Sequence, residues 1–277
     1  METALDRLRL ALQRIAPGGE FAEAYSGGLD SRFLAHAALL LGFRPRLLHV
    51  TGVHIGEDRE TVVGWASRQG LECRVVEFDP LSVPEVASGS KYRCYGCKKA
   101  IFSVLKEMAQ GLPLCDGTNH SDLDAGQWRP GLRALKELGI ASPLAEAGLG
   151  KPEIRAIARE TGMERPDQKP EPCLLTRLPY GVSPQAEVLV KLREGERAVR
   201  KVLCAAGLKE PACRIRLVAG GRPELHFPRE TWDAMTPALR EAVESSVRKT
   251  APVFFTALQL RVLEKLSGYY DRTPGQA

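Results

Sequence analysis

The chain has no long apolar run and no secretory leader pattern. None of its apolar stretches approaches the ~20 residues that a membrane-spanning helix needs. Residues 1–8 carry acidic side chains between short apolar ones, which is typical of an amphipathic helix and not of a signal peptide. We therefore expect a soluble, cytoplasmic protein that has no membrane partner.

A disulfide framework is also missing. The seven cysteines are an odd number in a sequence without an export signal, which favours reduced thiols with metal or chemical roles. Four of them lie among apolar neighbours and are predicted to be plain buried residues: Cys73, Cys115, Cys204 and Cys213. The other three, Cys94, Cys97 and Cys173, have basic residues or prolines around them and need a separate explanation.

Most of the chain has no excess of either charge. Residues 1–179 contain equal numbers of basic and acidic side chains, so the whole net charge of +5 arises after Pro179. A moderate basic bias that is confined to one region fits an anionic small molecule and RNA equally well.

Strand and helix patterns alternate in the first part of the 277-residue chain. The expected elements are a helix at 3–15, strands at 21–25, 46–50, 73–78 and 112–115, and helices at 30–41, 59–69, 100–108, 130–138 and 151–161. This alternation predicts an α/β fold in which a parallel sheet has helices on both faces. Such sheets bind ligands at the carboxyl ends of their strands.

A proline-rich stretch ends this alternation. Five prolines between residues 165 and 184 exclude regular structure and predict an ordered loop or hinge. We therefore predict two domains, 1–179 and 180–277. The second is expected to be a smaller α+β domain, with helices at 186–206 and 237–249 and strands at 214–218, 224–227 and 253–258.

The run 24–31, Ala-Tyr-Ser-Gly-Gly-Leu-Asp-Ser, joins the first strand to the next helix. A glycine-rich turn at a helix start directs backbone N–H groups and hydroxyls toward a phosphate, and the helix dipole favours negative charge there. It is not a Walker loop, because no Gly-Lys-Ser/Thr follows and the sequence offers no lysine to reach a β- or γ-phosphate. The run resembles the pyrophosphate loop of the ATP pyrophosphatases. The predicted ATP-binding residues in it are Ser26, Gly27, Gly28, Asp30 and Ser31.

Acidic and amide side chains follow the strand expected at 112–115. Carboxylates at this edge of a sheet can hold Mg²⁺ while the metal bridges phosphate oxygens, although an Asx-rich turn would have the same composition. We predict Gly117 and Asn119, together with Thr51 after the second strand, as further ATP-binding residues. Asp30 and Asp122 are the predicted Mg²⁺ ligands.

Cys94 and Cys97 are three residues apart and precede the helix expected at 100–108. The helix start and the lysines that follow should lower the pKa of both thiols, which suits metal binding or redox chemistry. A zinc half-site or a redox pair would fit this motif alone, but zinc needs two further ligands and no second CxxC or paired histidine appears. Cys173, between two prolines and near Lys169 and Arg177, could complete an iron–sulfur cluster with one iron left open.

Six segments together resemble the LarE family, the ATP-dependent sulfur transferases that build the nickel-pincer nucleotide cofactor of lactate racemase. They are Ser26–Ser31, the run 93–99 with the CxxC, the run 116–119, the run 128–135 that begins at Trp128, the run 142–155, and the run 173–181 that begins at Cys173. The resemblance covers roughly residues 20–230. It implies an adenine-nucleotide α-hydrolase-like fold for the first domain, and substrate binding and oligomerisation for the second.

The resemblance also implies a reaction. The family uses ATP and Mg²⁺ to adenylate a carboxylate of a pyridinium dicarboxylate mononucleotide, releases pyrophosphate, and replaces the adenylate with sulfur to give a thiocarboxylate. Some members sacrifice the sulfur of one cysteine, matched here by Cys173, and leave it as dehydroalanine. Members that also have the CxxC are expected to hold a [4Fe–4S] cluster whose open iron carries a sulfide. Because Cys94, Cys97 and Cys173 are all present, we interpret the chain as the cluster type, which needs an external sulfide donor.

The family's phosphate-binding Arg-x-Arg is matched by Arg214 and Arg216. Two arginines at i and i+2 on a strand share one face and could clamp a nucleotide phosphate, whereas an edge strand with solvated arginines is the alternative. Beyond Leu217 the resemblance weakens, because Glu224-Leu225-His226 replaces the family's usual Arg-Ile-Glu.

Two other functions stay open from the sequence. A tRNA thiolase also combines a pyrophosphate loop with three cysteines, but the chain has no paired CxxC of a zinc ribbon, so a nucleic-acid partner is disfavoured. A nucleotide-binding protein that senses iron or redox state through the three cysteines would need no catalysis. We expect a homo-oligomer.

Overall fold

The computed structural model describes residues 3–123 and 129–272, so Trp128 of the resemblance lies outside the described residues. The chain forms two compact units, each of which is described separately. The first comprises Met1–Gly52, Glu57–Asp79 and Cys94–Glu171, and the second comprises Val53–Gly56, Pro80–Arg93 and Pro172–Ala277.

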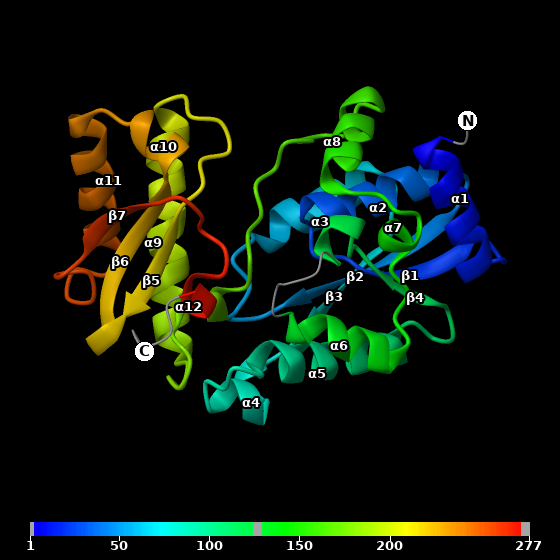
Figure 1. Ribbon diagram of the computed structural model, residues 1–277, viewed down its shortest axis with the longest axis horizontal. Coiled ribbons are helices and arrows are strands. Elements are labelled where there is room, and N and C mark those ends of the chain that lie inside the picture. Colours follow the sequence, from blue (N-terminus) through cyan, green and yellow to red (C-terminus); the bar gives the residue numbers. More distant parts are fainter. Residues whose placement is uncertain (1–2, 124–128, 273–277) are drawn as a thin grey trace. The chain divides into compact units, whose positions relative to one another are not determined.

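A four-stranded parallel sheet forms the centre of the first unit (Figure 1). Its strands are β1 Glu20–Ala24, β2 Arg44–Thr51, β3 Cys73–Glu77 and β4 Leu114–Asp116, in the order β3-β2-β1-β4. Strand β1 pairs with both β2 and β4, with Ala22 opposite Arg46 on one side and Leu114 on the other. The loop after β1 therefore starts from the middle of the carboxyl edge, where parallel sheets bind ligands.

Helices cover both faces of this sheet, as the sequence predicts. They are α1 Ala4–Ile15, α2 Leu29–Leu40, α3 Arg59–Arg68, α5 Arg93–Met108, α6 Pro130–Leu138, α7 Pro143–Glu146 and α8 Lys151–Glu160. Side chains alternate between the faces with the period of two that a strand imposes. Phe21 of β1 packs with α1, α2 and α8, whereas Ala22 packs with α5 and α6 on the other face (Figure 1).

Helix α5 begins at Arg93, seven residues before its expected start at Ala100. The run Cys-Tyr-Gly-Cys-Lys-Lys has no apolar stripe, and the glycine in it lowers helix propensity, so the local pattern hides the first turns. A tertiary anchor compensates: the buried Arg93 guanidinium donates to the carbonyls of Leu178, at 2.8 Å, and Pro179, at 3.1 Å. The CxxC consequently lies inside the helix and not before it.

The second unit contains a three-stranded sheet with α9 and α11 packed together on it (Figure 1). Its elements are η1 Pro80–Ser82, α4 Pro84–Ala87, η3 Leu174–Arg177, α9 Ala186–Ala205, β5 Arg214–Val218, β6 Arg222–Pro228, α10 Arg229–Asp233, α11 Pro237–Thr250, β7 Gln259–Leu263 and α12 Tyr269–Arg272. The strand order is β5-β6-β7, with β5 antiparallel and β7 parallel to β6. This agrees with the smaller α+β domain expected from the sequence.

The strand expected at 253–258 is wrong. These residues form turns, and the strand comes later, as β7. Val253 is 92% exposed, whereas Phe255 and Leu258 are buried, so the buried positions are three residues apart and do not follow the period of two of a strand. Arg248 at the end of α11 donates to the carbonyls of Phe255, at 2.8 Å, and Thr256, and these bonds hold the chain in a turn.

In the part of the chain that the structure describes, no helix is long and apolar enough to cross a membrane.

Candidate functional site

The loop between β1 and α2 is shaped by glycine. Gly27 has φ +81°, and a Cβ atom there would lie 2.6 Å from Val62 Cγ2, so only glycine fits. The Ser26 and Ser31 hydroxyls lie 3.1 Å apart across the loop, and the Gly28 N–H donates to Ser26 Oγ at 3.3 Å. Among the described residues no side chain caps the N-terminus of α2, which leaves its first N–H groups for an anion.

The segment after β4 packs directly against this loop. A Cβ atom on Gly117 would lie 2.9 Å from the Ser31 nitrogen, so the two backbones approach as closely as glycine allows. The Asp116 carboxylate is used inside its own turn: it accepts from the Thr118 hydroxyl at 2.5 Å and from Ser142 Oγ at 2.6 Å. The tertiary structure thus brings Gly117 to the loop between β1 and α2, and Asn119 follows two residues later, whereas Asp116 has a structural role.

Lys151, the first residue of α8, contacts Asp30 at the start of α2. Its Nζ lies 2.5 Å from Asp30 Oδ2, and its backbone N–H donates to Ser121 Oγ at 3.1 Å. Burial raises the pKa of the Asp30 carboxyl, and the Lys151 charge opposes that rise. The expectation that no lysine is available to a phosphate at this loop is therefore wrong. A lysine 121 residues further along the chain supplies the charge.

Two oxygen atoms beside the loop are suited to a divalent cation. Asp30 Oδ1 and Asn119 Oδ1 are buried and have no hydrogen-bond partner among residues 3–123 and 129–272, although buried oxygens normally have one. Carboxylate and amide oxygens are the ligands that Mg²⁺ prefers, so this donor set fits the metal. Asp122 fits less well, because its carboxylate already accepts from Asn119 Nδ2 and from Arg129 Nη1, both at 2.7 Å. Thr51 ends β2 at the same edge of the sheet.

Arg214 and Arg216 lie on β5 in the second unit and are buried, with exposures of 8% and 1%. The alternative of solvated arginines on an edge strand is therefore wrong, although β5 is an edge strand. Both guanidinium groups donate to the Leu266 carbonyl, Arg214 at 2.6 Å, and Arg216 also stacks on the Tyr269 ring at 4.7 Å. Burial, and next the nearby Arg177 guanidinium, lower the pKa of Arg214 to about 9 and that of Arg216 to about 10. The Leu266 carbonyl and the Tyr269 ring are uncharged, so they leave positive charge on the two guanidinium groups, which an anion would neutralise.

His226 fixes the position of Arg216. An arginine only donates hydrogen bonds, so His226 Nδ1, 2.5 Å from Arg216 Nη1, must be an acceptor. The proton then resides on Nε2, which donates to Glu224 Oε2 at 3.0 Å. Burial lowers the pKa of His226 to about 4 and keeps the ring neutral at pH 7.

This histidine gives the second unit a defined pH dependence. The folded pKa of about 4 lies below the ordinary value of 6.5, so the unfolded chain binds more protons between these two values. The contribution of His226 to stability is complete above pH 6.5 and is lost as the pH falls toward 4. We expect it to lower the free energy of unfolding by about 2 kcal/mol between pH 7 and pH 5. Urea unfolding at both pH values should show a smaller decrease for His226→Gln, and an equal decrease would contradict this prediction.

Cys173 directly precedes η3, and its backbone is held there. Its carbonyl accepts from the Thr176 hydroxyl at 2.7 Å, and the Arg177 guanidinium donates to the carbonyl of Pro172 at 3.2 Å. Arg177 also forms a buried two-bond ion pair with Glu196, with N–O distances of 2.7 and 2.8 Å. Cys173 is near enough to Arg177 for a charge on its sulfur to interact with the guanidinium group.

Cys94 and Cys97 lie in the first turn of α5, where Cys94 is exposed and Cys97 is buried. These two belong to the first unit and Cys173 to the second. Within either unit, as far as the structure describes it, no three His, Cys, Asp or Glu side chains form a group that could hold a metal ion. The three-cysteine cluster stays a prediction.

Relatives of known sequence place the chain in a family. An uncharacterized protein of Synechocystis sp. is 33% identical over 186 residues, which are 65% of this chain and 68% of that protein. An uncharacterized protein of Methanocaldococcus jannaschii is 35% identical over 190 residues, or 66% and 70% of the two chains. A Lactiplantibacillus plantarum protein named pyridinium-3,5-bisthiocarboxylic acid mononucleotide synthase is 26% identical over 199 residues, or 70% and 69%. The chain belongs to the same family as the Synechocystis and M. jannaschii proteins. No protein-family model matches it.

The sequence interpretation missed three side chains that the structure brings to the predicted site residues or to their neighbours. Lys151 contacts Asp30, Glu196 pairs with Arg177, and His226 holds Arg216. In the sequence Lys151 stands at a helix start and within the run 142–155 of the resemblance, whereas Glu196 is only one acid in a charged helix. Two of the four cysteines predicted to be buried are not: Cys204 is exposed on α9, and Cys73 is only partly buried.

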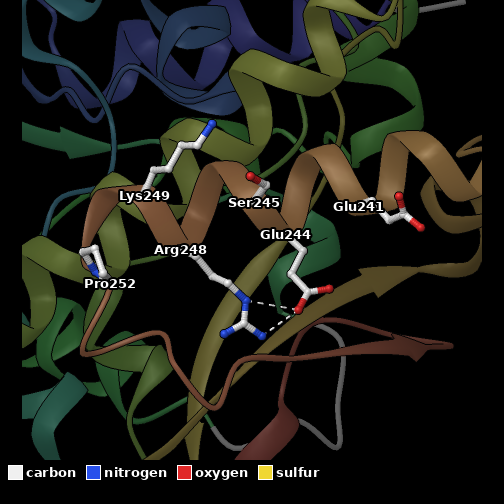
Figure 2. Close-up of a pocket in the computed structure, with 6 residues that line it drawn as sticks. All are labelled: Glu241, Glu244, Ser245, Arg248, Lys249 and Pro252. Carbon is white, nitrogen blue, oxygen red and sulfur yellow. Dashed lines mark hydrogen bonds and ion pairs between the residues drawn. The ribbon is translucent and has the colours of Figure 1, made fainter.

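A surface depression runs along α11 (Figure 2). The β5 arginines are not among the residues that line it. It is lined by Glu241, Glu244, Ser245, Arg248, Lys249 and Pro252. Figure 2 shows Arg248 turned toward Glu244, with which it pairs at 2.6 Å, and the same guanidinium also holds the following turn. Its charge is therefore already compensated.

Proposed function

We propose that this protein is an ATP-dependent sulfur transferase that converts a carboxylate of a pyridinium dicarboxylate mononucleotide to a thiocarboxylate. The observation that carries the proposal is the phosphate loop with Lys151 placed on Asp30, a pair that would handle a triphosphate. The L. plantarum relative, which is named as the synthase of a pyridinium bisthiocarboxylate mononucleotide, supports the choice of acceptor.

The first step is adenylation of the acceptor. The triphosphate would lie at the N-terminus of α2, where the free N–H groups and the helix dipole favour negative charge. Asp30 and Asn119 would hold Mg²⁺, which neutralises phosphate charge when bound. A carboxylate oxygen of the substrate then attacks the α-phosphorus, the bond to the bridging oxygen breaks, and pyrophosphate leaves. Lys151 would move from Asp30 to the departing pyrophosphate and stabilise its charge.

The second step is transfer of sulfur. A carboxylate oxygen is a poor leaving group until it carries the adenylate, whose departure as AMP makes the carbonyl carbon open to attack. In the sacrificial route the Cys173 thiolate attacks this carbon and AMP leaves. Loss of the Cys173 α-proton then breaks the Cβ–S bond, leaving a thiocarboxylate on the substrate and dehydroalanine in the chain. Arg177 would favour the thiolate form of Cys173.

We further propose the cluster form of this chemistry, with Cys94, Cys97 and Cys173 as ligands of a [4Fe–4S] cluster. Three thiols are the donor set that such a cluster needs when one iron stays open. When bound, the cluster would supply the sulfide that Cys173 otherwise loses. Cys94 and Cys97, at i and i+3, lie on one side of the first turn of α5.

Arg214 and Arg216 would bind the phosphate of the mononucleotide. A phosphate oxygen is a charged acceptor and forms stronger hydrogen bonds with arginine than the neutral Leu266 carbonyl does, so it would replace that carbonyl. Each such contact contributes roughly 1.5–3 kcal/mol. We expect Arg216→Ala to raise the KM for the mononucleotide about tenfold or more and to leave the KM for ATP unchanged.

Arg229 provides the matched control for this variant, because it is an arginine of the same unit with a 63% exposed side chain. Arg229→Ala should behave as the wild type when pyrophosphate release is measured against each substrate. A change in the ATP KM of Arg216→Ala would place this arginine at the nucleotide triphosphate instead.

The test of the function itself is pyrophosphate release. Wild-type protein with ATP and Mg²⁺ should release pyrophosphate when the pyridinium dicarboxylate mononucleotide is added, and should not do so when tRNA is added. Release with tRNA alone would favour a tRNA thiolase. Release with neither acceptor would favour a redox-sensing nucleotide-binding protein.

A further inference from the structure

Gln168 lies beneath the phosphate loop although it belongs to a distant segment. It is 5% exposed, and its side chain contacts α2 and the loop of the first unit, 141 residues earlier in the chain. The segment that carries it is itself fixed: Arg32, buried on α2, donates to the carbonyls of Glu164 at 2.6 Å and Arg165 at 3.1 Å. The Gln168 N–H closes the turn by donating to Arg165 O at 3.1 Å.

The partners of Gln168 determine how its amide is oriented. Arg32 only donates, and its Nε and Nη2 lie 3.1 and 2.5 Å from one end of the amide, so that end must be the oxygen. The NH₂ group consequently faces two acceptors. It donates to Glu57 Oε1 at 3.0 Å and, at 3.5 Å, to the Gly27 carbonyl.

A hydrogen bond to the Gly27 carbonyl acts on the next amide. Within a trans peptide the C=O and the N–H point in opposite directions, so holding the Gly27 oxygen on the Gln168 side aims the Gly28 N–H at the other side of the loop. There it meets Ser26 Oγ at 3.3 Å. Gly27, with φ +81°, has the conformational freedom to turn this peptide the other way, so a restraint on it is needed.

We propose that Gln168 is a positioning residue of the phosphate loop, one that holds the Gly27–Gly28 peptide with its N–H on the Ser26 side of the loop, where the phosphates of ATP would lie. Glu57 completes the restraint from the same side, since its carboxylate lies against Gly27 and accepts from Gln168. This inference rests on the proposed function, because it assumes that the loop binds ATP. The residue acts through the backbone and does not itself contact the nucleotide.

Two variants separate positioning from simple packing. Gln168→Met keeps the size but removes every hydrogen bond, so we expect the dissociation constant for a non-hydrolysable ATP analogue to rise about tenfold. Gln168→Glu keeps the oxygen that faces Arg32 and loses the donor that faces Gly27. At pH 8 it should weaken binding at least as much, because its carboxylate also repels Glu57.

Arg32 donates to the same end of this side chain and favours the carboxylate form of Gln168→Glu, so this variant offers no donor to the Gly27 carbonyl. Calorimetric titrations of the ATP analogue should therefore show both Gln168 variants binding about tenfold or more weakly than the wild type. Gln69→Met, at the C-terminus of α3 in the same unit, is the control and should bind as the wild type.

The outcomes are distinguishable. Wild-type affinity in both Gln168 variants would overturn the positioning role while leaving ATP binding intact. A lower unfolding midpoint with unchanged affinity would show a packing role and would also overturn it. Failure of the wild type to bind the ATP analogue would instead overturn the proposed function.

Discussion

Replacing Lys151 with methionine should reduce pyrophosphate release at least about 100-fold. Its ammonium group lies 2.5 Å from Asp30, and in the proposed reaction it moves to the pyrophosphate that leaves. Loss of a positioned charge at a developing anion commonly lowers the rate by about 10²–10³. The measurement is substrate-dependent pyrophosphate release at saturating ATP, so that weaker nucleotide binding does not contribute.

The same change also leaves the partly buried Asp30 without its cation, so folding must be checked separately. The double variant Asp30→Asn, Lys151→Met removes both charges and should unfold near the wild-type midpoint, yet it should be inactive. Lys106→Met is the matched control. This lysine of α5 donates to the Leu138 carbonyl and pairs with no acidic side chain in the described part of the chain. Near-normal pyrophosphate release by Lys151→Met would refute the assignment of the loop to ATP.

Replacing Cys173 with alanine should abolish thiocarboxylate formation and leave pyrophosphate release intact. Both routes of sulfur transfer need this thiol, whereas adenylation needs only the phosphate loop and the acceptor. Mass spectrometry of the product and a pyrophosphate assay on the same sample would test the separation of the two steps. Formation of thiocarboxylate by Cys173→Ala would remove the residue from the mechanism.

The CxxC then distinguishes the two routes. If the cluster forms, protein purified without oxygen should be brown, should turn over repeatedly with added sulfide, and should lose iron and activity together as Cys94→Ala. In the sacrificial route Cys94→Ala should be fully active, and Cys173 should lose the mass of H₂S once per chain. Cys204→Ala is the control for both, since Cys204 is another exposed thiol.

The fold of the first unit follows from local patterns. Apolar residues recur with a period of two in the strands and near 3.6 in the helices. Strands and helices alternate along the chain, and a parallel sheet with helices on both sides is the arrangement that buries both faces of the sheet. Two elements depart from these local patterns, one through a local contact and one through a tertiary contact. Residues 253–258 are apolar enough for a strand, but Arg248 binds their carbonyls and holds a turn. The start of α5 has no apolar stripe, and buried contacts of Arg93 hold it instead.

The fold class, the glycine turn at Gly27 and the resemblance to the LarE family could be predicted from the sequence, because each of these depends on short runs of residues that are neighbours in the chain. Only the tertiary structure decided which charges meet. Lys151 lies on Asp30 across 121 residues, Gln168 lies under Gly27 across 141, and Arg216 is buried between His226 and Leu266. Burial removes these polar groups from water, so each one needs a hydrogen-bond or ionic partner in the folded chain. The packing of distant segments against one another selects that partner.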